Sequence, residues 1–509
     1  MTGENRRGDE ETLRSEAAPA RRLGKTVARG AAYSGTAQGL KVLISMALMV
    51  VVARILTPSD YGVIAMTAPI SGFILIFQNL GLNQALIQSR EISDEQVNAL
   101  FFYNLAASAA VAIVFVMLSP LVGMFYGDPR PAYVMAASGA TVLVTGSALQ
   151  HSALLSRHMR YKALSFVDVM STAATFLFTL AFAIWLRNYW SLWLGAFVGA
   201  VVTALLLWRI DRWRPRRRIA WRSARHLVTF GANLTGFNLL NFLARNLDNV
   251  LIAKFWGPDV LGLYERSYKL MMFPLQNINS PLSRIMLPAL ARVQDEPDRY
   301  RRIYCLAVRS IAFACIPGII AAAICSDRLV PFLLGEQWAS AGPIFFWLCL
   351  AAITQPISNA TGWLFVSTGR TNEMFRWSLF ATPLTIGGFV IGLPWGATGV
   401  AAAYFAVQVI CVPVLYRWST RNSPVRALDL YGAALSPLLG GALAWLVDHG
   451  IKAHVGFLPR LCLVFLSAYL FSAAFQALTR GGRLALREFA NLMRSAFLGQ
   501  PSSSRDRGA

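Results

Sequence analysis

The chain has few charged residues for its length. Only 14% of its 509 residues are Asp, Glu, Lys or Arg, whereas 56% are hydrophobic. A soluble globular protein carries about 25% charged residues, so this composition excludes a soluble chain. Apolar stretches of about 20 residues, long enough to cross a bilayer, recur along the sequence. They predict a polytopic membrane protein.

The sequence also lacks the residue patterns of metal and catalytic sites. Its 6 cysteines lie mostly within apolar runs and form no CxxC pair, which argues against a disulfide framework or a zinc site. Its 5 histidines form neither a cluster nor an HExxH pattern, and no GxSxG, Walker or Rossmann pattern stands in a suitable context. We therefore expect no catalytic residues, no metal and no cofactor.

The apolar runs predict an all-α polytopic membrane protein with about fourteen transmembrane helices. Short connections near Asn188 and Pro394 indicate antiparallel neighbours. The predicted spans are 31–54, 62–88, 97–119, 132–150, 163–186, 190–209, 228–254, 261–291, 303–326, 341–366, 374–393, 397–416, 430–448 and 457–478.

Acidic residues are scarce, with 25 Asp and Glu against 47 Lys and Arg, for a net charge of +22. If the N-terminus lies in the cytoplasm, 34 of the 47 bases fall in inner segments and 7 in outer segments. This positive-inside bias predicts that both termini are cytoplasmic, and it accounts for the charge without a nucleic-acid partner. The densest basic run, RIDRWRPRRR (209–218), is expected to lie against anionic lipid headgroups.

One turn sequence occurs twice. ARILTPSDYG (53–62) and AKFWGPDVLG (253–262) share a basic residue, a Pro and a Gly at the same spacing. An ungapped comparison of 38–87 with 238–287 gives ten identities in fifty positions. Pro and Gly are residues that end one helix and begin the next, so each copy predicts an outer turn between two helices.

The copies lie six predicted helices apart and so have the same orientation, as in transporters built from parallel repeats. We expect the substrate site at the repeat interface, near the membrane midplane. The predicted domains are a polar basic tail (1–30), an N-lobe of helices 1–6 (31–210), a basic cytoplasmic linker (211–225), a C-lobe of helices 7–12 (226–418), helices 13–14 (430–478) and a second cytoplasmic tail (479–509).

Polar residues follow one face of the helix that leads each lobe, at steps of three and four. A charge at a helix centre costs about 2.5–3.5 kcal/mol on insertion scales, so these groups are expected to face water, each other or a substrate. With Asp248 counted as the only acid well inside a core helix, the set is basic, which suits an anionic ligand such as a diphosphate. The predicted cavity residues are Lys41, Asn241, Arg245, Asp248, Arg266, Lys269, Gln78, Asn79, Gln276 and Asn279.

Structural alternatives remain for several of these residues. Asp248 could pair with Arg245 within one helix, or it could bind a coupling ion. Arg266 and Lys269 could instead lie near the outer headgroups, and Lys41 could have a structural role.

The chain resembles the polysaccharide transporter (oligosaccharide flippase) branch of the MOP superfamily. The resemblance rests on ARILTPSDYGVIA, on SRHMRYKAL (156–164), on LLGEQW (333–338) and above all on RNLDNVLIAKFWGPDVLGLYERSYKLMMFPLQNINSPLSRIMLPALARVQ (245–294). It covers roughly residues 30 to 480.

This resemblance implies a MATE-like fold. It also implies transport of undecaprenyl-diphosphate-linked glycan units across a bacterial inner membrane by alternating access, with other polysaccharide assembly proteins as expected partners. Two rival functions remain. A drug or cation antiporter should have an acidic cavity, whereas this one is predicted to be basic. A polysaccharide polymerase or ligase usually needs a large external loop, and the longest external stretches here are short (near 120–131, 327–340 and 449–456).

Overall fold

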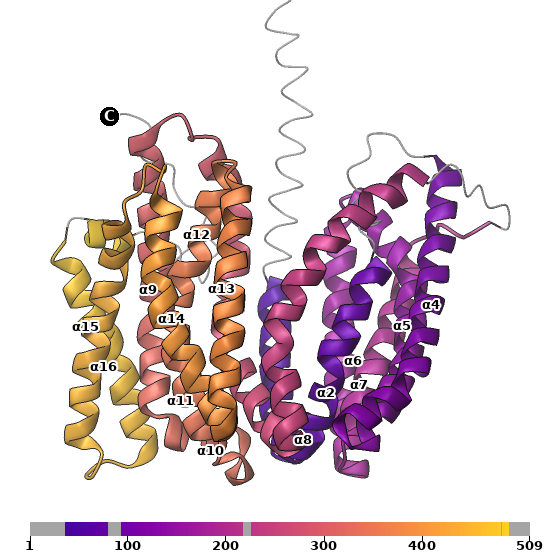
Figure 1. Cartoon of the computed structure of the whole chain (residues 1–509), viewed down its shortest axis with the longest axis horizontal. Coiled ribbons are helices and arrows are strands. Elements are labelled where there is room, and N and C mark those ends of the chain that lie inside the picture. Colours follow the sequence, from indigo (N-terminus) through magenta and orange to yellow (C-terminus); the bar gives the residue numbers. More distant parts are fainter. Residues whose placement is uncertain (1–35, 80–92, 217–224, 480, 488–509) are drawn as a thin grey trace, which may run out of the picture. The chain divides into compact units, whose positions relative to one another are not determined.

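The computed structural model describes residues 36–79, 93–216, 225–479 and 481–487 (Figure 1). Within these ranges, ten helical stretches are long and apolar enough to cross a membrane. One of the ten, Thr371–Thr420, covers two predicted spans, 374–393 and 397–416, which are joined by a short turn. The predicted all-α polytopic fold is confirmed, and the chain is a multi-pass membrane protein.

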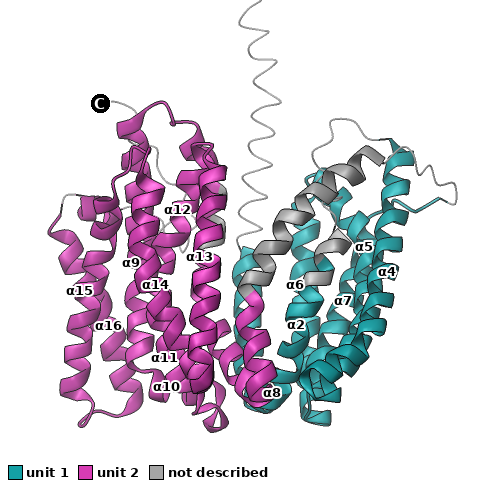
Figure 2. Ribbon diagram, viewed as in Figure 1, with its two compact units in different colours: residues 1–245 teal, residues 246–509 magenta. Residues whose placement is uncertain are grey.

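The chain divides into two compact units, Met1–Arg245 and Asn246–Ala509, and the boundary falls within helix α8 (Figure 2). The lobe and tail boundaries expected from the sequence stay a prediction.

Unit 1 is a bundle in which α4 packs on α5, α6 on α7, and α5 on α7. A cluster of buried side chains from α5, α6 and α7 forms part of its core, including Leu155, Val167 and Leu207. The helices are Thr36–Ala53, α2 (Pro58–Asn79), α4 (Asp94–Tyr126), α5 (Pro129–Arg157), α6 (Tyr161–Leu186) and α7 (Trp190–Ile210).

Helices α6 and α7 approach closely at two glycines four residues apart. A Cβ atom at Gly195 or Gly199 would collide with the Thr179 or Thr175 side chain. Small residues at this spacing let membrane helices pack in close van der Waals contact. Such contact is important because there is no hydrophobic driving force for helix association in lipid. The GxxxG pattern thus determines how this pair packs.

Unit 2 contains the second part of α8 and the helices after it. Within it, α9 packs against α11, α12, α15 and α16 (Figure 1). The elements are α8 (Arg225–Ala291), α9 (Pro297–Ile324), α10 (Ser326–Leu334), η2 (Glu336–Trp338), α11 (Ala341–Ala352), α12 (Gln355–Ser367), α13 (Thr371–Gly392), η3 (Leu393–Trp395), α14 (Gly396–Thr420), α15 (Ala427–Ile451) and α16 (Phe457–Ala477).

Two details of unit 2 differ from the sequence prediction. The expected span 341–366 consists of two shorter helices, α11 and α12. The segment before it, expected to be an outer loop, contains the short helix α10 and the turn η2. The LLGEQW motif ends there in Trp338, which is fully buried, so this segment packs into the unit.

Two ion pairs lie near opposite ends of α15. Arg301 of α9 makes two 2.8 Å hydrogen bonds to Asp429 near one end. Near the other end, Arg460 of α16 makes hydrogen bonds of 2.6 and 3.1 Å to Asp448, and both residues are buried. Bidentate Arg–carboxylate pairs fix orientation as well as distance, so they hold α15 and α16 in register with their neighbours.

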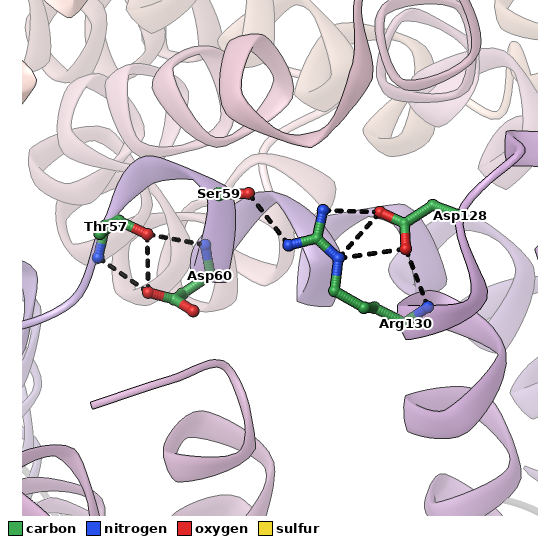
Figure 3. Close-up of polar contacts among 5 residues, drawn as sticks. All are labelled: Thr57, Ser59, Asp60, Asp128 and Arg130. Atoms are coloured by element: carbon green, nitrogen blue, oxygen red, sulfur yellow. Dashed lines mark hydrogen bonds and ion pairs between the residues drawn. The ribbon is translucent and has the colours of Figure 1, made fainter. Parts of the chain in front are cut away.

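The first of the two predicted turns is closed by side-chain hydrogen bonds (Figure 3). Thr57 precedes α2, whose first residue is Pro58. The Asp60 carboxylate accepts hydrogen bonds from the Thr57 backbone N–H, at 2.9 Å, and from its hydroxyl, at 2.7 Å. The Asp60 backbone N–H donates to the Thr57 hydroxyl oxygen at 3.4 Å. This reciprocal arrangement is a capping box.

An arginine from a neighbouring hairpin also contacts this turn. Arg130, near the start of α5, donates to Ser59 Oγ at 3.3 Å (Figure 3). It is held by three hydrogen bonds to the Asp128 carboxylate, the shortest 2.7 Å. Although burial opposes ionisation, these hydrogen bonds and the Arg130 charge hold the pKa of Asp128 below its ordinary value of 3.8.

The second turn breaks α8 at Gly257, which has φ 78° and ψ −175°. Glycine adopts positive φ without the steric cost that a Cβ imposes, and the extended ψ suits a residue that precedes Pro258. On the same turn, Trp256 Nε1 donates to the Leu393 carbonyl at 2.8 Å. Both predicted helix breaks are present.

Candidate functional site

In unit 1, the predicted cavity residue Lys41 lies on the helix Thr36–Ala53. Its ammonium is 3.7 Å from the Asp168 carboxylate of α6, and the two side chains are 38% and 62% exposed. An ion pair this open contributes little to stability. Lys41 therefore has a carboxylate neighbour that the sequence analysis did not assign to it.

In unit 2, the predicted cavity residue Asp248 is buried, with 6% of its surface exposed. Its Oδ2 accepts a 2.9 Å hydrogen bond from the Tyr264 hydroxyl, and its Oδ1 accepts one of 2.8 Å from the Asn249 backbone N–H. Tyr264 in turn stacks on Tyr268. A buried carboxylate needs such donors. The Arg245 side chain, the other predicted partner, lies outside the described side chains.

Glu265 corrects the expected charge balance. From the sequence, Asp248 is the only acid expected well inside a core helix, but the Glu265 side chain is also only 12% exposed. Its carboxylate lies 3.2 Å from Arg266 Nε and forms an ion pair with Lys269 one turn later. Arg266 and Lys269 therefore share a buried counter-charge, and the set is less basic than predicted.

The remaining predicted residues are not brought together by these contacts. Gln276 is exposed on α8. The described groups form one pair in unit 1 and two clusters in unit 2. Asn241, Arg245, Gln78, Asn79 and Asn279 lie outside the described side chains, so their predicted role stays a prediction.

Sequence reasoning missed a buried polar cluster at the end of α7. His151 of α5 is fully buried, and its Nδ1 forms a 2.9 Å hydrogen bond with Asp211 Oδ2. The rings of Trp208 and Trp213 lie beside it, 4.6 and 5.6 Å away between centroids. The available signal was Asp211 itself, a rare acid within the densest basic run.

The sequence comparisons agree on one family. The family model for polysaccharide biosynthesis proteins matches residues 51–343. The lipopolysaccharide biosynthesis protein WzxC of Escherichia coli (strain K12) is 26% identical over 393 residues, covering 76% of this chain and 79% of that protein. The succinoglycan biosynthesis transport protein ExoT of Rhizobium meliloti (strain 1021) is 24% identical, covering 85% of this chain and 88% of that protein.

Solved structures agree on the fold. The inward closed conformation of the lipid II flippase MurJ superposes with a TM-score of 0.70 at 12% identity, covering 87% of this chain and 98% of that one. An inward-facing multidrug resistance MATE transporter of the MOP superfamily superposes with a TM-score of 0.63 at 13% identity, covering 77% of this chain and 96% of that one. The MATE-like fold expected from the sequence is confirmed.

Proposed function

Because the chain belongs to the polysaccharide biosynthesis protein family, we propose that it is a flippase for lipid-linked glycans. It translocates undecaprenyl-diphosphate-linked oligosaccharide or polysaccharide repeat units across the bacterial inner membrane by alternating access, for surface polysaccharide biosynthesis. The observation that carries the proposal is the family match over 51–343, which includes both repeat turns and the charged clusters at Asp248 and Glu265.

The chemistry of the described groups supports this substrate class. A glycan headgroup carries many hydroxyls, each costly to strip of partners in hydrocarbon. Membrane helices that carry ionisable side chains offer such partners. Lys41, Arg266 and Lys269 also supply positive charge, which attracts a diphosphate. Asp168 and Glu265 lie beside these bases and balance part of their charge.

A complementation experiment tests the function. Deleting the gene should make a lipid-linked glycan intermediate accumulate and surface polysaccharide disappear, and the wild-type chain should restore both. Lys41→Ala and Arg245→Ala should insert normally but fail to restore export. Lys452→Ala, which removes an exposed base after α15, is the matched control and should restore it. Normal polysaccharide in both cavity variants would contradict the basic-cavity part of the proposal. Absence of the intermediate from the deletion strain would contradict the function.

We also propose that Asp248 is the coupling-ion site, because it is a buried membrane carboxylate whose described donors are a hydroxyl and a backbone N–H. Asp248→Asn preserves the shape and removes the charge. In proteoliposomes, its glycan translocation should no longer respond to an imposed proton or sodium gradient. An unchanged gradient response would assign Asp248 a structural role.

The predicted orientation, with both termini cytoplasmic, completes the proposal. Cysteines placed at Arg421 and at Lys452 should react differently with a membrane-impermeant thiol reagent in intact cells. Only the outer position, Lys452, should be labelled. Labelling of Arg421 instead would invert the topology.

A further inference from the structure

The six residues after α7, 211–216, have no regular secondary structure, and we call this segment the arginine strap. Buried polar side chains fix its two ends. His151, fully buried, forms a hydrogen bond with Asp211 at the start. Asn98 of α4, 3% exposed, accepts from the Arg216 backbone N–H at 2.7 Å and donates to its carbonyl at 3.0 Å at the end. Such anchoring gives the strap a defined backbone conformation.

The middle of the strap is held by aromatic packing. The Trp213 ring lies 5.7 Å from the Phe101 ring of α4 and 5.6 Å from the His151 ring, between centroids. Its backbone N–H also donates to Asp211 Oδ1 at 3.3 Å. These contacts hold the strap in the middle as well as at its ends, and all three of its arginine side chains are exposed.

The strap carries an arginine at every second position: 212, 214 and 216. These three side chains are exposed, whereas residues 211, 213 and 215 are buried or half-buried. Arg214 is fixed further, since its Nη1 donates to the Asp211 and Trp213 carbonyls at 2.7 Å each. Its guanidinium lies 5.6 Å from the centre of the Trp208 ring, a cation–π arrangement.

These arginines line a cavity of about 350 Å³ within unit 1. Among the lining residues in the described part of the chain, Asp94 is the one acid, and it lies 3.9 Å from Arg216 in a pair that is more than 70% exposed on both sides. The pair is too open and too long to neutralise the site strongly. The lining residues are Asp94, Asn98, Arg212, Trp213, Arg214, Pro215 and Arg216.

We propose that this cavity binds the phosphate of an anionic phospholipid headgroup. The guanidinium fork matches phosphate oxygens geometrically and stays charged at all relevant pH values. The strap also begins directly where the apolar helix α7 ends, which is the depth of the headgroup region for a spanning helix. Trp208 and Trp213 are of the residue type enriched at that interface. None of its lining residues is among the predicted substrate-cavity residues.

Lipid titration of the purified, detergent-solubilised full chain tests the site, with native mass spectrometry to count bound molecules of phosphatidylglycerol or phosphatidylcholine. The variant R212Q/R214Q/R216Q removes the three cavity charges. The matched control R302Q/R417Q/R421Q removes three exposed charges elsewhere on the predicted cytoplasmic side. All six side chains are exposed, and the strap stays anchored by Asp211, Trp213 and Asn98 when the Arg214 hydrogen bonds are lost. Unchanged thermal unfolding checks that both variants fold.

Wild type and the control should each retain one tightly bound phosphatidylglycerol. The strap variant should bind this lipid at least about tenfold more weakly, because charge-assisted hydrogen bonds are lost. R212K/R214K/R216K should be weakened too, since lysine keeps the charge but not the fork. Equal loss in the strap variant and the control, or full retention in the lysine variant, would show only general attraction of charge and overturn the site. Displacement of the lipid by millimolar inorganic phosphate would assign the cavity to a free anion instead.

Discussion

The two repeat hairpins have the same turn but different chemistry. In unit 1, the turn before Pro58 is closed by the Thr57–Asp60 capping box. In unit 2, the turn before Pro258 is made by Gly257 at positive φ. The helix break is thus made by side-chain hydrogen bonds in the first copy and by a glycine backbone conformation in the second, at positions two hundred residues apart.

The helices after the turns differ more. The second copy carries Glu265, Arg266 and Lys269, where the first has Ala65, Met66 and Pro69 at the corresponding positions. Ala65 and Met66 are buried, and the Met66 carbonyl accepts a 3.2 Å hydrogen bond from Tyr126. One copy is thus an apolar packing helix and the other a charged one. The difference teaches that the repeat preserves the architecture, while the polar chemistry is placed mainly in one copy.

The largest expected effect comes from removing the buried acid of the second copy. Glu265→Gln removes the carboxylate charge beside Arg266, only 13% exposed at its side chain, and beside Lys269. Breaking a buried pair from one side costs about 3–5 kcal/mol. We expect the thermal unfolding midpoint in detergent to fall clearly, and glycan export to fall with it.

A second substitution separates charge balance from shape. Glu265→Gln combined with Arg266→Gln restores the balance and should recover much of the lost stability. If the double variant is as unstable as the single one, Glu265 acts through packing and the charge argument fails. Ala65→Glu, which places an acid at the matching position of the apolar copy, should be as damaging as Glu265→Gln.

The sequence predicted the architecture well and the partners of the charged residues poorly. Apolar runs located the spans because a membrane helix must be apolar over about 20 residues, and the Pro–Gly spacing located both helix breaks. Glu265 was overlooked although it stands one turn before Lys269, a spacing that pairs side chains on a helix. The Lys41–Asp168 and His151–Asp211 pairs could not be predicted, since they join different helices and depend on how those helices pack.

The turns themselves give a middle-sized effect. Gly257→Ala forces a Cβ into positive φ at an extended ψ and should cost about 1–3 kcal/mol, although no atom lies within 4 Å to clash with it. Thr57→Ala removes a cap and should cost about 1 kcal/mol, but Thr57→Gly only a few tenths. Thermal unfolding of the three variants checks this order. Equal losses for Thr57→Gly and Gly257→Ala would show that the two turns do not differ as described.

Acid should weaken the Asp128–Arg130 ion pair beside the first turn, whereas the second turn has no such pair among its described contacts. Because the folded-state pKa of Asp128 lies below 3.8, the Asp128–Arg130 contribution to stability is complete at neutral pH. It is lost as the pH falls below 3.8 through the folded-state pKa. The second turn is held by Gly257 and by a Trp256–carbonyl bond, which do not titrate. Asp128→Asn should reduce the acid dependence of unfolding between pH 5 and 2.5. An unchanged pH profile would contradict this assignment.

The smallest stability effect is expected at the pair that joins the first copy to α6. Lys41 and Asp168 are 3.7 Å apart and substantially exposed, so a double-mutant cycle with Lys41→Ala and Asp168→Ala should give a coupling of about 0–1 kcal/mol. Export is expected to respond differently, since Lys41 is proposed to attract the substrate diphosphate. Lys41→Ala should stop export with almost unchanged unfolding, whereas Asp168→Ala should leave the base available and retain export. A coupling well above 1 kcal/mol, or equal export defects in the two variants, would make Lys41 a structural residue like those of the second copy.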